Sequence, residues 1–430
     1  MAVYHLQYQP RAPAAEGLGF GGPQNPSAHL LGYLGSMVNP KGPSCAPVPA
    51  ASARFVWSDG NSSLRTLRQK WVSADGIIVG ADCRAELNGG CYTKVRRTWT
   101  PRSNVDLRTW TPSHPLRRSV PLAVTIAMQW GYGMFHFPME AMVALAAVEP
   151  PLLRDAALHV ARRSEFVRQW LEVAAPLVNW SHVVEGDIYA RTLHVPKPGR
   201  CSKPSTAQIG WLRRAVLAAL RRPTANEGSA ITLRPLGHME AVGRSDARPL
   251  RRSAIAGPLG HLERSSAPAL VVVKRSNFSQ NEHLNQHRSI RDFDDAVVRP
   301  SAEFAAAHGL RLELHNDAAL PPVIDQLRLF SRAAIVVAPL GAGEVNLIAT
   351  PAGACVVELV DPCLFEATRG GCDGKPHVDP TYQRICGILG IRHTVVPTPG
   401  LVADAAKVRA ALRDCGGGRT ALSRLHHDST

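Results

Sequence analysis

Short apolar strands in the second half of the chain constrain the fold most. The stretches 269–274, 334–338 and 354–360 are nearly continuous runs of Val, Ile, Leu, Ala and Cys. Helical patterns at 294–308 and 322–332 separate them, and a further strand is expected at 310–314 between those helices. Strands buried on both faces have this continuous apolar character, and helices between consecutive strands give a parallel sheet. The second half is therefore predicted to be a Rossmann-like parallel sheet covered by helices on both faces.

The first half shows the same alternation less regularly. Residues 120–127 form an apolar run long enough for one buried strand, and 139–148 is strongly helical. Ser164 in front of 165–173 predicts an N-capped amphipathic helix. Residues 182–195 predict two strands about a Gly turn. Alternating strands and helices favour a layered α/β structure here too.

Composition and patterning together predict five segments. A leader rich in Pro, Ala, Gly and Ser is expected to be disordered, and a stretch of Gly, Pro, Ser and scattered Arg is expected to be a flexible insertion between two α/β domains. In chain order the segments are the leader 1–63, an N-terminal α/β domain 64–222, the insertion 223–267, a C-terminal Rossmann-like domain 268–398, and a C-terminal helix and tail 399–430.

The charge balance raises the question of a nucleic-acid partner. The chain has 49 Lys and Arg against 34 Asp and Glu, a formal net charge of +15. A basic surface attracts polyphosphates. Basic pairs such as Arg213-Arg214 and Arg251-Arg252 are not interleaved with the aromatic residues that stack on single strands. No nucleic-acid partner is expected, and either a solvated Arg-rich surface or a basic cleft for a nucleotide diphosphate fits the pattern.

The cysteines do not predict a metal site. There are nine, an odd number, without CxxC or Cys/His ligand spacing, so no metal is expected. The pairs Cys83/Cys91 and Cys363/Cys372 are close enough in sequence for loop disulfides in an oxidising compartment. Nine thiols suit a reduced interior equally well.

A glycine loop follows the apolar strand 334–338. Gly341, Ala342 and Gly343 lie between that strand and a helical stretch, where free backbone N–H groups and a helix dipole could hold a phosphate. As a dinucleotide fingerprint the loop has Asn346 where the third glycine should stand, and Glu358 is the only acid near the expected distance. NAD binding, and a turn used only for tight packing, remain the alternatives.

Two further groups of residues carry chemistry. Arg275 ends a strand, and Arg288 lies in the next loop, so both could form bidentate contacts to a diphosphate, unless they belong to a solvated face. His136 and Glu140 are four residues apart and share a face at the start of a helix. The histidine could be a general base or a ligand for a sugar hydroxyl, or a structural, partly buried residue.

The order of these motifs resembles the family 61 glycosyltransferases. In the second half the resemblance rests on 271–275, Arg288, 324–330, 341–346 and 351–358, and in the first half on 131–136, Glu140, 193–196 and 201–204. It extends over about 70–222 and 268–398.

The resemblance implies two Rossmann-like domains of the GT-B architecture and an inverting transfer. The donor is then a UDP-sugar, commonly carrying xylose or N-acetylglucosamine, the acceptor is a glycan or glycoprotein, and no cofactor or metal is needed because helix dipoles and basic side chains stabilise the leaving diphosphate. The first domain would bind the acceptor and the second the nucleotide sugar. The residues expected to bind the donor are Arg275, Arg288, Gln326, Gly341, Ala342, Gly343, Asn346 and Glu358.

Individual roles follow from the positions of these residues at strand ends and in the first domain. Arg275 is expected to contact the diphosphate and Glu358 the ribose hydroxyls. His136 is expected to be the base that deprotonates the acceptor, oriented by Glu140, with Glu185 or Asp187 next in line.

One departure from the family pattern concerns the glycine loop. The family has a histidine directly before Gly-Ala-Gly, and this chain has Leu340, which removes a hydrogen-bonding, titratable group beside the phosphates. The alternative function is therefore a catalytically weakened homologue that binds nucleotide or glycan without transfer. Arg291, and Asp325 before Gln326, are smaller departures.

The family resemblance places the chain in the Golgi or endoplasmic reticulum lumen. The sequence itself shows no signal or membrane-spanning segment. Membrane association is expected only through a segment not present in this sequence, and a cytosolic setting stays open.

Overall fold

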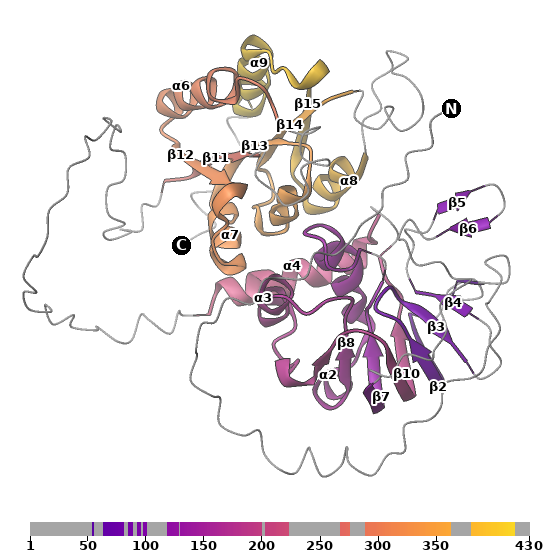
Figure 1. The fold of residues 1–430 in the computed structure, drawn as a ribbon. Coiled ribbons are helices and arrows are strands. Elements are labelled where there is room, and N and C mark those ends of the chain that lie inside the picture. The colour runs from indigo at the N-terminus through magenta and orange to yellow at the C-terminus, as the bar shows by residue number, and fades with distance from the viewer. Residues whose placement is uncertain are drawn as a thin grey trace, which may run out of the picture. The chain divides into compact units, whose positions relative to one another are not determined.

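The computed structural model describes much of the chain between Arg54 and Gly417 (Figure 1). The described ranges are 54–55, 63–80, 85–88, 93–95, 98–100, 118–128, 130–199, 203–222, 267–275, 289–362 and 380–417. All of them belong to one compact unit, Lys41–Thr430. Nearly all of the predicted leader 1–63 and insertion 223–267, and the tail beyond residue 417, lie outside the described residues.

The second half is a parallel sheet, as predicted, with a fifth strand in addition to the four that the sequence indicated. Its strands are β11 (Ala269–Lys274), β12 (Arg311–Asn316), β13 (Ala333–Pro339), β14 (Cys355–Val360) and β15 (Arg392–Pro397). They run in the order β12-β11-β13-β14-β15, with all four pairings parallel. Every residue of β13 and β14 is buried, which explains their continuous apolar sequence. This doubly wound order reverses direction between β11 and β13, and ligands bind at such a switch point, outside the carboxyl ends of the strands.

Helices cover both faces of this sheet (Figure 1). One face packs against the π-helix η6 (Asp294–Val298), α6 (Arg299–His308) and α9 (Ala405–Gly416). The other packs against α7 (Val323–Phe330), the 3₁₀-helix η8 (Ala342–Ala349) and α8 (Pro380–Leu389). Short 3₁₀ turns lie at η7 (Asp317–Ala319) and η9 (Pro399–Leu401). The second half is therefore a sheet between two layers of helix.

The first half contains a mixed eight-stranded sheet. Its order is β1-β4-β3-β2-β10-β7-β8-β9, and β5 with β6 forms a separate two-stranded sheet. The strands are β1 (Arg54–Phe55), β2 (Leu64–Val72), β3 (Ile77–Val79), β4 (Ala85–Leu87), β5 (Thr93–Val95), β6 (Thr98–Thr100), β7 (Arg118–Thr125), β8 (Ala157–His159), β9 (Val183–Val184) and β10 (Ile188–Pro196). Strands β7, β8 and β9 pair in parallel, and β2 pairs antiparallel with β3 and β10.

Two sequence predictions for the first half need correction. The strands predicted within 182–195 exist as β9 and β10, but β7 and β8 lie between them, because the long β10 is buried in the centre and the two-residue β9 is an edge strand. The helix predicted at 139–148 is a π-helix, η2 (Phe137–Ala141), followed by a 3₁₀-helix, η3 (Met142–Ala147). Every residue from Phe137 to Leu145 is buried, so surrounding contacts rather than one amphipathic face set its geometry.

The remaining helices of the first half begin with the caps that the sequence indicates. They are α2 (Pro150–Asp155), α3 (Glu165–Ala174), η4 (Trp180–His182) and α4 (Thr206–Leu220). Oγ of Ser164 accepts the backbone N–H of Val167 at 3.2 Å, which confirms the predicted cap of α3. Ser205 and Gln208 form a reciprocal capping box at α4. None of the helices in the described ranges has the length and apolar character that crossing a membrane requires.

Helix α4 joins the two halves. Its buried residues Ile209, Leu212 and Val216 belong to the same apolar cluster as residues of α7, η8 and α8. Nη1 of Arg213 donates to the carbonyl oxygens of Ile348, at 3.2 Å, and Thr350, at 2.9 Å. Burial lowers the pKa of Arg213. The apolar core is therefore continuous from one half to the other.

A disulfide bond links the first residue of β14 to the end of α9. Cys355 and Cys415 are both buried, and their Cα atoms are 5.7 Å apart. The sequence did not indicate this pair, because 60 residues separate the two cysteines. The predicted pairs Cys83/Cys91 and Cys363/Cys372 lie outside the described residues.

Candidate functional site

The ends of β11 and β13 bring two predicted site elements together at the switch point of the second sheet. Arg275 directly follows β11, and the glycine loop directly follows β13. Nη1 of Arg275 donates to the carbonyl oxygen of Leu340 at 3.2 Å. The guanidinium therefore lies on the glycine loop, at the edge where doubly wound sheets bind their ligands.

Gly341 lies directly against the guanidinium of Arg275, so a larger residue there would displace that side chain. A Cβ atom built on it would lie 1.8 Å from Nη1 of Arg275. Its N–H donates to Oε2 of Glu344 at 3.0 Å, and its carbonyl oxygen accepts the hydroxyl of Tyr382 at 2.6 Å. Three side chains thus hold two successive peptide groups of the loop, which preorganises it.

Gln326 and Asn346 meet behind the loop. Both are buried, and Nδ2 of Asn346 donates to Oε1 of Gln326 at 3.0 Å. Nε2 of Gln326 donates to the carbonyl oxygen of Pro321 at 2.8 Å. The amide pair ties η8 to α7, and its predicted contact with a donor stays a prediction.

Glu358 lies beneath the loop, next to Glu344. Both side chains are fully buried. Oε2 of Glu358 is 2.8 Å from Nε2 of His393, on the neighbouring strand β15. With an exposure of 0% the carboxylate does not reach the surface, so its predicted contact with a ribose stays a prediction.

Burial strongly affects the titration of this group of residues. It raises the pKa of Glu344 well above the ordinary range, and the negative charge of Glu358 raises it further. Burial also raises the pKa of the Cys386 thiol on α8, and the negative charges of Glu344 and Glu358 raise it further. Glu344 is therefore a neutral carboxylic acid over a pH range in which an exposed glutamate is ionised.

His136 and Glu140 form the contact that their spacing predicts. Nδ1 of His136 lies 2.8 Å from Oε2 of Glu140, at the start of the π-helix η2. The ring is partly exposed and the carboxylate is fully buried. Because the carboxylate accepts from Nδ1–H, the second ring nitrogen, Nε2, is left as the acceptor. No residue in the described ranges hydrogen-bonds to Nε2.

The loop around His136 has unusual backbone geometry. Trp130 has a φ of 63°, in the left-handed region that few non-glycine residues adopt, and its ring meets His136 edge-on at 5.3 Å. Short π-helical segments occur frequently at functional sites, as does such backbone strain.

Aromatic contacts connect this loop to the glycine loop. The ring centroids of His136 and Phe135 are 5.7 Å apart, and those of Phe135 and Tyr382 are 5.8 Å apart. Tyr382 in turn hydrogen-bonds Gly341. The structure thus brings the first-half and second-half predictions into one neighbourhood.

The other predicted residues are distributed as follows. Arg288 lies outside the described residues, the backbone of Ala342 begins η8, and Gly343 packs beside Val273. Glu185 accepts the backbone N–H of Arg163. Asp187 raises the pKa of Asp75, after burial, through its negative charge.

Sequence reasoning missed three residues of this site. Glu344 is a charged residue inside an otherwise apolar stretch, a signal that could have singled it out. Tyr382 and His393 reach the loop and Glu358 only through the fold, 41 and 35 residues away. Among the described residues, no three His, Cys, Asp or Glu side chains are grouped so that they could hold a metal ion.

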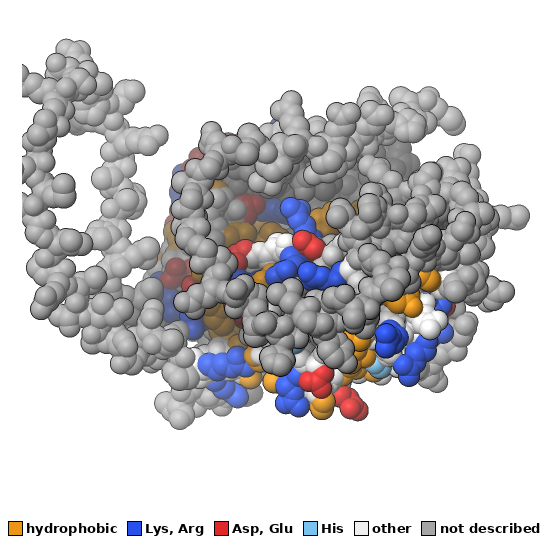
Figure 2. All heavy atoms as spheres, turned by 60° about the horizontal axis from the view of Figure 1, so that its bottom comes forward, with side chains coloured by type: hydrophobic (Ala, Val, Ile, Leu, Met, Phe, Trp, Pro, Cys, Tyr) orange, Lys and Arg blue, Asp and Glu red, His pale blue; other side chains and the backbone are white. Residues whose placement is uncertain are grey.

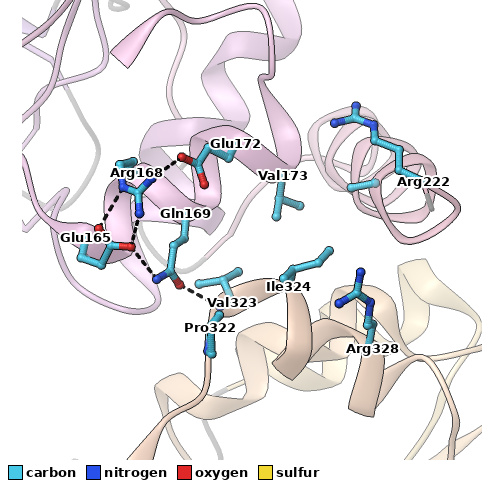
Figure 3. A pocket seen from close by; sticks show the side chains of 11 residues that line it. Glu165, Arg168, Gln169, Glu172, Val173, Arg222, Pro322, Val323, Ile324 and Arg328 are labelled. Atoms are coloured by element: carbon cyan, nitrogen blue, oxygen red, sulfur yellow. Dashed lines mark hydrogen bonds and ion pairs between the residues drawn. The ribbon is translucent and has the colours of Figure 1, made fainter. Parts of the chain in front are cut away.

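A separate cavity of about 430 Å³ lies between α3, the end of α4 and α7 (Figure 3). Arg168 pairs there with Glu165 and Glu172, and Oε1 of Gln169 accepts the backbone N–H of Val323 at 2.8 Å. None of the predicted site residues lines this cavity. On the face shown in Figure 2, Lys and Arg side chains lie in separate groups with acidic and apolar ones between them.

Solved structures with a distant likeness to the chain include a flavoprotein and a heptosyltransferase. A diflavin flavoprotein from Nostoc sp. is 15% identical, with a TM-score of 0.22, over 37% of this chain and 98% of its own. The iron-containing dodecameric heptosyltransferase TibC in complex with ADP-D-β-D-heptose is 12% identical, with a TM-score of 0.29, over 83% of this chain and 92% of its own. TibC from enterotoxigenic E. coli, a bacterial iron-containing dodecameric glycosyltransferase, is 12% identical, with a TM-score of 0.28, over 82% of this chain and 92% of its own. TM-scores this low do not establish a common fold.

Comparison with protein families gives a specific result. No curated protein matches the chain. The family profile described as Glycosyltransferase 61 matches residues 134–357, just over half of the 430 residues. The match begins two residues before His136 and includes Arg275, the glycine loop and the beginning of β14. The chain belongs to the glycosyltransferase 61 family.

Proposed function

We propose that the chain transfers a sugar from a UDP-sugar to a glycan or glycoprotein acceptor, with inversion at the anomeric carbon. The observation that supports this most is the meeting of Arg275 with the glycine loop at the switch point between β11 and β13. A guanidinium, loop N–H groups and the start of a helix form a site for a diphosphate. Family membership supports the class of reaction.

The donor side of the reaction needs stabilisation of negative charge. When the bond between the anomeric carbon and the diphosphate breaks, its electron pair stays on the diphosphate oxygen. Arg275 is proposed to hold that charge, together with backbone N–H groups of the loop. Preorganised donors of this kind do so without a metal ion, and no resident metal is proposed.

The acceptor side needs a base on the opposite face of the sugar. The acceptor oxygen forms the new bond to the anomeric carbon, and its proton passes to Nε2 of His136 in this proposal. Glu140 accepts from Nδ1–H, which fixes the tautomer and stabilises the imidazolium that forms. Because displacement occurs in one step, the configuration inverts.

Arg275→Ala is expected to weaken UDP binding by about 1–3 kcal/mol, the cost of losing a charge-assisted hydrogen bond. Isothermal titration calorimetry with UDP measures this. Arg299→Ala is the matched control, since Arg299 is an exposed arginine of the same half, paired with Asp295. Equal UDP affinity in the parent and Arg275→Ala would place the diphosphate elsewhere.

Glu358→Gln is expected to weaken UDP binding more than inorganic diphosphate binding, if its carboxylate accepts from the ribose. The measurement is the ratio of the two affinities, because a general loosening of the loop would weaken both ligands equally. An unchanged ratio removes Glu358 from the ribose site and leaves it with a role inside the protein.

Leu340 supports a second candidate, a homologue that binds nucleotide or glycan without transfer. Its side chain is buried, with 5% exposure, and only its backbone contributes to the loop, since its carbonyl oxygen accepts from Arg275. Turnover across a panel of UDP-sugars with mass detection separates the two candidates. UDP binding without transfer or hydrolysis of any sugar would favour this second one.

A luminal setting, Golgi or endoplasmic reticulum, is part of the proposal. The bond between Cys355 and Cys415 supports it, because disulfides persist in oxidising compartments and are rare in the cytosol.

A further inference from the structure

We propose that Glu344 is a positioning residue of the donor site, which shares one proton with Glu358 and, as a neutral acid, holds the Gly341 peptide beside Arg275. The inference rests on the proposed function for its consequence at the diphosphate. Its basis is a pair of buried carboxyl groups, of which Glu344 has no part in the mechanism above.

The contacts of the pair favour a shared proton. Oε2 of Glu344 accepts from Gly341, and Oε2 of Glu358 lies against His393, so each carboxyl group has one oxygen engaged. The other oxygen of each, Oε1, is buried without an N–H or O–H partner. The negative charge of Glu358 nevertheless acts on Glu344 and raises its pKa. Two buried carboxyl groups that affect each other in this way do not both ionise readily, and one proton would satisfy the unpartnered oxygen of each.

The surroundings favour Glu344 as the neutral partner. Arg275 acts on it from the end of β11, Cys386 from α8 and Glu358 from β14, while the hydroxyl of Tyr382 on α8 donates to the adjacent carbonyl oxygen of Gly341. His393, on β15, lies against Glu358 rather than Glu344. Arg275 is the one permanent cation among these groups and opposes the raised pKa of Glu344, but burial and Glu358 have larger effects.

A neutral Glu344 matters for an anionic ligand. Its carbonyl oxygen can accept from Gly341 in the neutral form as well as in the ionised form, so the loop stays in place. An ionised Glu344 would add a negative charge behind the loop that is proposed to bind diphosphate, and it would compete for Arg275. Deprotonation should therefore weaken nucleotide binding without loss of the loop contact.

The shared proton is also expected to make the free energy of unfolding depend on pH. In the folded state the pKa of Glu344 is raised above its unfolded value, so the folded chain binds more protons between the two values. The free energy of unfolding then falls as the pH rises through that interval. For one proton the limit is a tenfold change in the unfolding constant per pH unit.

The test compares Glu344→Gln with the parent in two measurements. Chemical unfolding from pH 5 to 9 should show stability falling with pH more steeply in the parent than in Glu344→Gln, whose side chain cannot ionise. UDP calorimetry from pH 7 to 9.5, above the second phosphate ionisation near pH 6, should show affinity falling in the parent and changing less in the variant. Glu303→Gln, which removes an exposed carboxylate paired with Arg409, is the control for a lost charge.

Glu344→Ala supplies the third comparison. It removes the acceptor for the N–H of Gly341 and should weaken UDP binding about tenfold at every pH. Glu344→Gln keeps an acceptor oxygen there and should retain most of the parent's UDP affinity at pH 7. Coincident pH profiles for the parent and Glu344→Gln, or a loss in Glu344→Gln equal to that in Glu344→Ala, would overturn the proposal. If the parent does not bind UDP at all, the proposed function fails. The pH dependence of unfolding then tests by itself whether Glu344 and Glu358 share a proton.

Discussion

Replacement of His136 by alanine is expected to lower turnover by about 10²–10⁴-fold with little change in UDP affinity, because proton transfer to a positioned base is worth that factor. The histidine is the one residue of the first-half site that is both partly exposed and held by a buried carboxylate. Turnover with a UDP-sugar and acceptor, beside UDP calorimetry, measures the two effects separately. Donor affinity should persist because the proposed diphosphate site lies on the second sheet.

Two further variants make the His136 result specific. Glu140→Gln keeps a side chain of the same size beside Nδ1 but no longer stabilises the imidazolium, so an intermediate loss of turnover is expected. His194→Ala removes a half-exposed histidine of the same half, paired with Thr66, and should change turnover little. Near-parental turnover in His136→Ala would make it a structural residue of its aromatic loop, with Glu185 or Asp187 as the next candidates for the base.

Loss of the disulfide between Cys355 and Cys415 is expected to lower the free energy of unfolding by about 2–5 kcal/mol. The bond closes a long loop, with a sequence separation of 60 residues, which restricts the unfolded chain. Denaturant unfolding of the parent with and without a reductant measures the effect. In the double variant Cys355→Ala/Cys415→Ala the reductant should have a clearly smaller effect than in the parent.

Cys386 provides the control for this experiment. It is a free, buried cysteine of the same half, so Cys386→Ala alters packing while the disulfide stays in place. Its unfolding should still respond to the reductant. A parent whose unfolding midpoint is the same in both conditions would show that the pair contributes nothing to stability.

The second sheet could be predicted from the sequence to within one or two residues at most strand ends. Strand β11 has the predicted bounds, and β14 begins one residue later than predicted. Strands buried on both faces are apolar at every position, so their sequence signal is strong. The first half gave a weaker signal because β8 has three residues and β9 two, and because residues 137–145 are all buried and so show no amphipathic pattern.

Separation along the sequence decided which contacts of the site could be predicted. His136 and Glu140 are one helical turn apart, so spacing alone predicted their hydrogen bond. The contacts of Glu344 with Glu358, and of Tyr382 with Gly341, join residues far apart in sequence, and only the folded sheet brings them together. The family resemblance indicated Glu358 as a site residue, but not the buried acid beside it.

Helix α4 couples the stability of the two halves, although each half has its own sheet. By position it belongs to the first half, yet its apolar side chains and Arg213 are engaged with α7, η8 and α8 of the second. Melting of either half would expose apolar surface of the other, so the two sheets lose stability together. A substitution deep in the second sheet can therefore reduce the population of chains with an intact His136 loop, although it touches no residue of the first half.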